Sequence, residues 1–329
     1  MFDVISFGSA VLDVFVKSPE LKILKTDKVF TGEALIVPYG AKCEVEKLVV
    51  TSGGGGTNTA VGFARLGLKA AVVARCGWDF AGKLIRKELK KEKVDDSLLV
   101  QIEGEETDYS TILIGPGGNR TILVYRGGTR LEKSVINWSR LKTRWFFIAS
   151  LEGNLSLLAE LLKFAQKNKI KVAINPGRRE IGKRKKLLSL LSKVDVLIIN
   201  REEAAKLVGE EYFDPKVFQK AALVSEGLIA VTKGKDGVVL FDQKDNLLVS
   251  GGFKTEMADA TGAGDGFGVG FVSGLIKGWS LEKALKLGVS NGAAVVTEIG
   301  AKAGLLYEKN LHNWLKKPLK MGWRRPRKA

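Results

Sequence analysis

Short apolar runs rich in β-branched residues alternate with segments of helical periodicity along most of this chain. Several of the runs are apolar throughout, as expected for parallel strands that helices cover on both faces. The predicted strands cover residues 2–7, 71–74, 145–149, 170–174, 194–199, 228–231 and 238–241. The predicted helices cover residues 57–66, 81–89, 155–166, 201–207, 215–225, 263–276 and 281–297. This alternation predicts an α/β fold with a doubly wound, mostly parallel sheet.

Two segments interrupt the alternation. Residues 13–50 contain strands and turns but no long helix, and residues 109–126 read as a hairpin with Pro116, Gly117, Gly118 and Asn119 in its turn. We interpret residues of about 14–50 and 107–128 as a small β-sheet that projects from a single domain of residues 1–329. Such a sheet could act as a lid over a substrate cleft. The alternative is that these segments extend an edge of the main sheet.

A glycine-rich segment near the C-terminus leads into the helix predicted from residue 263. Gly262, Ala263 and Gly264 end a loop, and the first amides of a helix have no partners within it. Such amides, together with the helix dipole, favour a bound anion such as a phosphate. Asp265 in the first turn is either a general base for an attacking hydroxyl or a stabiliser of the helix N-terminus. Gly270, like the glycines four residues before and after it, predicts close packing against another helix.

A second glycine-rich segment, residues 52–67, also enters a helix, with Asn58 in its first turn. The amide of Asn58 could bind sugar hydroxyls, or it could only cap the helix. The common nucleotide signatures are absent: there is no G-x-x-x-x-G-K-[ST], no G-x-G-x-x-G and no protein-kinase motif. The single histidine, His312, argues against a histidine triad or a site with several histidine ligands.

The chain is strongly basic, with a formal net charge of +17. Such a charge favours anionic partners, which include nucleotides and nucleic acid, and the tail of residues 316–329 contains seven Lys or Arg and no acid. A solvated basic surface is the simpler reading. Cys43 and Cys76 form no disulfide framework, and no uncharged apolar run is long enough to span a bilayer. We therefore expect a cytoplasmic protein without a membrane span.

Together the two glycine-rich segments resemble the paired signatures of the ribokinase-like (PfkB) carbohydrate kinase family. The first is similar to its G-G-x-x-x-N-x-A motif followed by A-R-L-G, and the second to its D-x-x-G-A-G-D motif. The residues that carry the resemblance are Gly53, Gly54, Asn58, Ala60, Ala64, Arg65, Leu66, Gly67, Asp259, Gly262, Ala263, Gly264 and Asp265. Weaker similarity extends to residues 77–82, 200–203, 232–237 and 300–304.

The resemblance implies a doubly wound fold with a small β lid and a kinase that uses ATP and Mg²⁺, with K⁺ as a further candidate cofactor. Asp265 would be the catalytic base, with the amides of residues 262–264 as the anion hole. The substrate-binding candidates are Asp13, Gly54, Asn58, Arg126 and Glu152. The nucleotide-binding candidates are Asn200, Thr232, Gly234, Gly237 and Asn291. Glu203 would act on Mg²⁺ indirectly, and Asp259 and Thr261 would bind a monovalent cation.

Plainer interpretations stay open for several of these residues. Asn200 and Glu203 could form only a capping box, Asp259 with Thr261 could only order a turn, and Arg126 could be solvated. Gly55 stands where ribokinases usually carry Lys, which argues against ribose as the acceptor.

We expect an ATP-dependent kinase whose acceptor is a sugar, with a nucleoside kinase as the alternative. A second alternative is an inactive kinase-fold regulator or a nucleic-acid binder, although no nucleic-acid motif with interleaved aromatic residues is present. An uncovered lid sheet could also pair with a second copy, which would give a homodimer.

Overall fold

The computed structural model describes residues 1–29, 32–116, 120–242 and 246–324. Its main sheet has the strand order β17-β16-β15-β14-β13-β12-β11-β1-β6. The parallel strands are β1 (Phe2–Phe7), β6 (Ala70–Val73), β11 (Thr143–Ile148), β12 (Lys171–Ile174), β13 (Val196–Asn200) and β14 (Leu228–Thr232). The antiparallel edge consists of β15 (Val238–Phe241), β16 (Leu247–Ser250) and β17 (Met321–Arg324).

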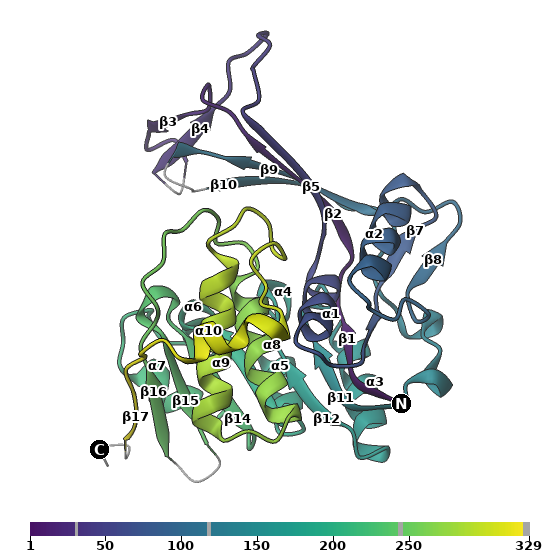
Figure 1. Cartoon of the computed structure of the whole chain (residues 1–329), viewed down its shortest axis with the longest axis vertical. Coiled ribbons are helices and arrows are strands. Elements are labelled where there is room, and N and C mark those ends of the chain that lie inside the picture. Colours follow the sequence, from purple (N-terminus) through teal and green to yellow (C-terminus); the bar gives the residue numbers. More distant parts are fainter. Residues whose placement is uncertain (30–31, 117–119, 243–245, 325–329) are drawn as a thin grey trace.

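Helices cover both faces of this sheet, so the predicted doubly wound fold is confirmed (Figure 1). The helices are α1 (Gly55–Arg65), α2 (Phe80–Lys91), α3 (Leu155–Lys167), α4 (Arg178–Ile181), α5 (Arg184–Leu191), α6 (Arg201–Val208), α7 (Lys216–Ala221), α8 (Ala263–Ile276), α9 (Leu281–Val295) and α10 (Leu311–Leu315). Short 3₁₀ turns are η2 (Lys133–Val135), η3 (Trp138–Arg140), η4 (Gly234–Asp236) and η5 (Glu308–Asn310). None of the helices in the described ranges is long and apolar enough to cross a bilayer.

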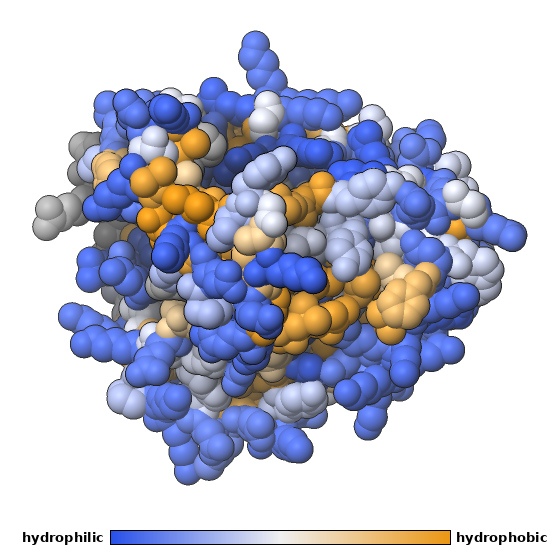
Figure 2. Space-filling model, turned by 90° about the horizontal axis from the view of Figure 1, so that it is seen from above, coloured by the Kyte–Doolittle hydropathy of each residue, from blue (hydrophilic) through white to orange (hydrophobic). Residues whose placement is uncertain are grey.

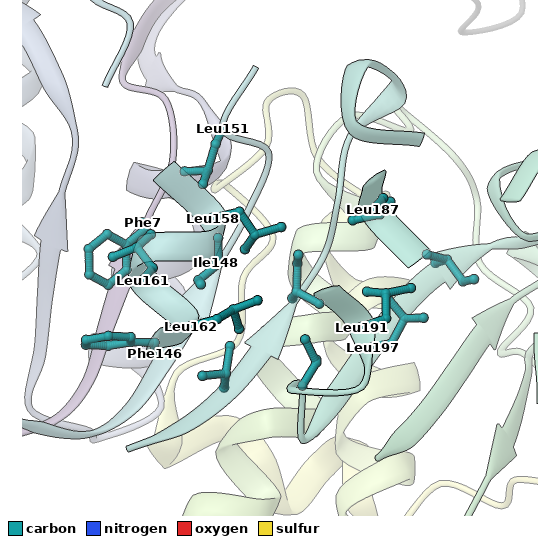
Figure 3. Close-up of a cluster of buried hydrophobic side chains, with 14 of the residues drawn as sticks. Phe7, Phe146, Ile148, Leu151, Leu158, Leu161, Leu162, Leu187, Leu191 and Leu197 are labelled. Atoms are coloured by element: carbon teal, nitrogen blue, oxygen red, sulfur yellow. The ribbon is translucent and has the colours of Figure 1, made fainter. Parts of the chain in front are cut away.

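The core on one face of the sheet packs α3 and α5 against β1, β11 and β13. Figure 3 shows leucines such as Leu158 and Leu191 pointing towards this layer, with Phe7 and Phe146 beside them. The rings of Phe7 and Phe146 meet edge to face with their centroids 4.8 Å apart. Because these strands are covered on both faces over most of their length, they are largely apolar, and this is why their sequence predicted a parallel sheet.

The opposite face is covered by α1, α8 and α9. A Cβ on Gly270 would lie 2.6 Å from the carbonyl oxygen of Leu287, and one on Gly274 would lie 2.6 Å from the Cα of Ala284. The glycines therefore allow the backbones of α8 and α9 to approach closely, and the predicted role of these glycines is confirmed. The packing fixes the start of α8, where Asp265 lies.

A second sheet stands apart from the first, with the order β10-β9-β2-β5. Its strands are β2 (Val11–Lys17), β5 (Lys47–Gly53), β9 (Asp108–Ile114) and β10 (Arg120–Tyr125), and it projects above the end of the body where β1 finishes (Figure 1). The interrupted segments thus form a separate small sheet and do not extend the main one. The glycines and Asn119 of the predicted hairpin turn lie outside the described residues. The lid boundaries and its movement stay predictions.

Two further strand pairs complete the fold. β3 (Lys22–Lys25) and β4 (Glu33–Ile36) form an antiparallel hairpin, while β7 (Arg75–Gly77) and β8 (Val100–Ile102) pair in parallel. Three residues of the small sheet, Phe15, Ile112 and Ile114, are buried and contact Ile299 of the body. This apolar contact holds the small sheet above the carboxyl ends of the parallel strands.

Candidate active site

The two glycine-rich segments meet at a hydrogen bond between α1 and α8. Asn58 Nδ2 donates to Asp265 Oδ2 at 2.9 Å, although the two residues are 207 positions apart. Gly54, not Asn58, is the N-cap of α1, and no side chain caps that helix, so the capping interpretation of Asn58 is wrong. Asn58 Oδ1 is buried and has no hydrogen-bond partner in the described part of the chain. That oxygen therefore lacks the donor that a buried amide oxygen ordinarily has.

The start of α8 has the geometry of an anion site. Gly262 is the N-cap in the left-handed region, with a φ of 80°, and a Cβ there would lie 2.7 Å from Ala301. At Gly264 a Cβ would meet no atom within 4 Å, so this residue faces open space. The free amides of the first turn can reach an anion in that space.

Asp265 is the acid in the first turn of α8. Burial raises its pKa to about 6, against the hydrogen bond from Asn58 and the positive charge of Lys302, which both favour the ionised form. A carboxylate with this pKa is ionised near neutral pH and still basic enough to take a proton from a hydroxyl. The helix-stabiliser role and the base role remain compatible with this position.

Asp13 of β2 brings a second carboxylate from the small sheet. It is buried, accepts a hydrogen bond from Ser110, and burial raises its pKa. A Cβ on Gly53 would lie only 1.8 Å from Asp13 Oδ2, so this position of β5 needs glycine for Asp13 to adopt its place. Gly54 has a φ of 88°, and a Cβ there would lie 2.5 Å from the carbonyl oxygen of Ser9. The glycines at 53 and 54 thus shape the site.

Arg126 and Glu152 are brought together in an ion pair. Arg126 Nη1 lies 2.7 Å from Glu152 Oε1 and donates to Asp108 Oδ2 at 2.8 Å. Arg126 is therefore paired, not simply solvated. Glu152 has a φ of 56°, an uncommon conformation for a residue other than glycine and one found at functional sites.

The loop that carries Glu152 is held by a buried acid that sequence reasoning missed. Glu180 accepts hydrogen bonds from the amides of Leu151 at 2.8 Å and Gly153 at 2.7 Å, and from Ser150 Oγ at 3.0 Å. Glu180 lies in the basic segment of residues 178–186, whose Arg and Lys residues suggest only a solvated surface. The signal that could have revealed it is an acid in the first turn of a helix that follows Gly177.

Two of the nucleotide candidates, Asn200 and Thr232, end the strands β13 and β14. Asn200 Oδ1 accepts from the amide of Glu203 at 2.9 Å, and Glu203 Oε2 accepts from the amide of Asn200 at 2.8 Å. The capping box is therefore present, which leaves the nucleotide and magnesium roles of both residues as predictions. Burial raises the pKa of Glu203.

The remaining nucleotide candidates lie in two places, the turn after β14 and the interior of α9. Thr232 ends β14, and Gly234 and Gly237 form the turn to β15, with a φ of 89° at Gly237. Asn291 is buried in α9, where Nδ2 donates to the carbonyl of Gly266 at 2.7 Å and Oδ1 accepts from the amide of Leu306 at 2.9 Å. These contacts give Asn291 a structural role, and its contact with a nucleotide stays a prediction.

Asp259 and Thr261 form a tight turn before α8. Asp259 Oδ1 accepts from the amide of Thr261 at 2.9 Å and from its hydroxyl at 2.7 Å, and Oδ2 accepts from the amide of Gly300 at 3.1 Å. Arg120 of the small sheet lies 3.8 Å from Oδ1. The turn-ordering interpretation thus describes the contacts seen, and the cation site stays a prediction.

Comparison with known proteins places this chain in one class, the kinases that phosphorylate an alcohol group. The family described as pfkB family carbohydrate kinase matches residues 3–307, and the chain belongs to this family.

Its relatives include a ribokinase of Haemophilus influenzae, 30% identical over 82% of this chain and 90% of the relative. A nucleoside kinase of Methanocaldococcus jannaschii is 28% identical over 77% of this chain and 82% of the relative. The Arabidopsis thaliana ribokinase complexed with ribose and ATP superposes with a TM-score of 0.78 at 20% identity, covering 96% of this chain and 99% of that one.

Proposed function

We propose that this chain is an ATP-dependent kinase that transfers the γ-phosphate to a hydroxyl of a sugar, with Asp265 as the general base. The observation that carries the proposal is the Asn58–Asp265 hydrogen bond of 2.9 Å, which joins the two glycine-rich helix starts at one point. It sets a carboxylate beside amides that can hold the group being transferred.

The polar atoms that are offered to the acceptor are mainly hydrogen-bond acceptors. The carboxylates of Asp13 and Asp265 and the Oδ1 atom of Asn58 accept hydrogen bonds. Asn58 Oδ1 is buried and has no hydrogen-bond donor among the described residues. A molecule with neighbouring hydroxyl groups supplies such donors. The ribose of a nucleoside has the same hydroxyls, and relatives include nucleoside and adenosine kinases, so a nucleoside kinase is the second candidate.

Gly55 bears on which sugar is bound. A Cβ at this position would lie 2.6 Å from the Cβ of Ala149 and 3.8 Å from Asp265 Oδ1. The position therefore adjoins the base, and a lysine there would have to displace its neighbours. We therefore propose an acceptor that differs from that of ribokinases with a lysine at this place.

In the proposed reaction the acceptor hydroxyl gives its proton to an oxygen of Asp265 as its own oxygen bonds to the γ-phosphorus. The bond between that phosphorus and the bridging oxygen breaks, and ADP leaves with the electron pair. The amides of Gly262, Ala263 and Gly264 stabilise the negative charge on the transferred group. Arg126 and Glu152, which form an ion pair at 2.7 Å, would bind and orient the acceptor.

The proposal includes Mg²⁺ and K⁺, and the side chains at the two candidate ion sites differ in how many hydrogen bonds they already make. One carboxylate oxygen of Glu203 bonds Asn200, and the other can bind a hydrated Mg²⁺ next to the nucleotide, so these residues fit an indirect role. Mg²⁺ bound to the phosphates would neutralise part of their charge. Asp259 already accepts three hydrogen bonds and faces Arg120, so K⁺ would depend on backbone carbonyls of this turn.

A homodimer formed through the small sheet also belongs to the proposal, as does a cytoplasmic location. Pairing sets Leu123 beside Thr111, Thr111 beside Val14, and Val14 beside Val50 on the outward face. Leu123 is 56% and Val50 50% exposed. Apolar patches are visible among hydrophilic residues on the view from this end of the molecule (Figure 2). Exposed apolar surface of this kind commonly binds a partner.

The test is an acceptor screen in which purified protein, ATP, Mg²⁺ and K⁺ are incubated with sugars, sugar phosphates and nucleosides. ADP release is followed for the wild type and for Asp265→Asn. A general base typically contributes about 10² to 10⁴-fold in rate, so the variant should lose that factor in kcat while it still binds ATP. More than about a tenth of wild-type kcat in a folded variant would refute the role of Asp265. No release with any acceptor would favour the regulator or nucleic-acid binder.

A further inference from the structure

Lys302 is a buried lysine that the proposed reaction does not use. The residue lies in the loop between α9 and η5 and is only 2% exposed. A buried ammonium group is unfavourable unless hydrogen bonds and opposite charges compensate it. Such a residue therefore requires a specific reason for its place.

The ammonium group of Lys302 binds the end of strand β5. Nζ donates to the carbonyl oxygen of Ser52 and to Ser52 Oγ, the latter at 2.7 Å. Arg65 holds the backbone of the same loop, because its Nη1 donates to the carbonyls of Lys302 at 2.5 Å and Leu305 at 3.3 Å. The loop and the lysine are thus fixed relative to α1 and β5.

Ser52 connects Lys302 to the part of the site that contains Asp13, the proposed ligand of the acceptor. It pairs with Leu12 in the small sheet and precedes Gly53, on which the carboxylate of Asp13 lies. Glu88 of α2 accepts from the amide of Ser52 at 2.7 Å and lies 3.9 Å from Lys302 Nζ. One ammonium and one carboxylate therefore fix the root of the small sheet from two sides.

The charges that act on Lys302 come from four elements. The negative groups are Asp13 on β2, Glu88 on α2 and Asp265 on α8, and Arg65 on α1 adds a positive one. Burial lowers the pKa of Lys302, while Glu88, Asp13 and Asp265 favour its charged form. In return Lys302 lowers the pKa values of Asp13 and Asp265, and Glu88 and Asp259 raise that of Asp13.

We infer that Lys302 is a positioning residue that ties the root of the small sheet to the body through Ser52 and, in its protonated form, places a positive charge at the site of the Asp13 and Asp265 carboxylates. The inference rests on the proposed function, since it assigns those two carboxylates to the acceptor and the proton. The lysine does not touch the reacting atoms. It keeps the base and the acceptor ligand ionised in a site whose burial opposes ionisation.

The test compares Lys302→Met with Glu88→Gln, two nearly isosteric variants that remove opposite charges. The pH dependence of kcat/KM is measured with D-ribose, D-fructose and adenosine as acceptors, using whichever supports turnover in the wild type. Loss of the ammonium should move the acid limb upward by about half a unit or more. Loss of the Glu88 charge should not move it upward, because Glu88 opposes the ionisation of Asp13 and is not among the charges that act on Asp265. Lys163→Met, at an exposed lysine on α3, controls for net charge.

A tether without an electrostatic role would leave the acid limb in place, so a folded Lys302→Met protein with the wild-type acid limb would overturn the inference. If Lys302→Met does not fold, as judged by circular dichroism, Lys302→Gln takes its place: an upward shift supports the inference and an unchanged limb refutes it. Asp265→Asn separates the two levels. An active Asp265→Asn protein refutes the proposed function, whereas an inactive one together with an unshifted Lys302 variant refutes only the role of Lys302.

Discussion

Replacing Asp265 by Asn should make the protein more stable at alkaline pH, because the native fold holds this carboxyl in a site that opposes its ionisation. The pKa of Asp265 is raised from 3.8 to about 6, mainly by burial. The hydrogen bond from Asn58 can persist in the variant, since a carboxamide oxygen also accepts. The change therefore removes the charge with little change of shape.

The size and sign of the effect follow from the two pKa values. In the unfolded chain the carboxyl ionises near 3.8, and in the folded chain near 6, so folding favours the protonated form. The resulting cost to stability is absent below the lower value, grows between the two and is complete above about pH 6. One pKa unit corresponds to about 1.4 kcal/mol, so the Asn variant should gain up to about 3 kcal/mol at pH 8 and about half of that at pH 5.

Urea unfolding of both proteins at pH 5 and pH 8 measures this difference in the free energy of unfolding. Asp27→Asn, at an exposed position of the small hairpin, controls for the loss of one negative charge. An Asp265→Asn protein that is no more stable than the wild type at pH 8, or whose gain does not grow from pH 5 to pH 8, would show that the fold does not oppose the ionisation of Asp265. The measurement needs no substrate, so it tests the environment of Asp265 independently of its role as a base.

Three further predictions concern the site and the small sheet. Asn58→Ala removes a hydrogen bond to a charged group, worth about 1.5–3 kcal/mol, so the acid limb of kcat should rise by about one to two pH units; an unchanged limb contradicts the role of this bond at Asp265. Gly53→Ala introduces a Cβ 1.8 Å from Asp13 Oδ2, so the acceptor KM should rise about tenfold or more while the KM for ATP changes little, and equal changes in both would argue against it. Leu123→Lys should convert a dimer to a monomer in light scattering, and a monomeric wild type would exclude pairing through this sheet.

Much of the architecture could be predicted from local sequence, because hydrophobic periodicity and its interruptions depend only on neighbouring residues. Uniformly apolar runs such as that of β6 identify buried parallel strands, and the interruptions of the helical rhythm identified the small sheet. Strand β17 was missed, because Met321–Arg324 lies in a basic tail and only its pairing with β16 makes it a strand. Helix α5 was missed for a similar reason, since its lysines conceal the buried Leu187 and Leu191.

The candidate site divides in the same way. Sequence alone determined that two glycine-rich helix starts carry Asn58 and Asp265, because motif spacing is local and glycine has few substitutes at such turns. The hydrogen bond between these two side chains becomes visible only in the folded chain. The same is true of the hydrogen bonds by which Asn291 joins α8 to the loop of Leu306, and of the contact of Lys302 and Glu88 beside Ser52. The physical reason is that burial and electrostatic coupling depend on distances between segments remote in the chain, which only the packed fold determines.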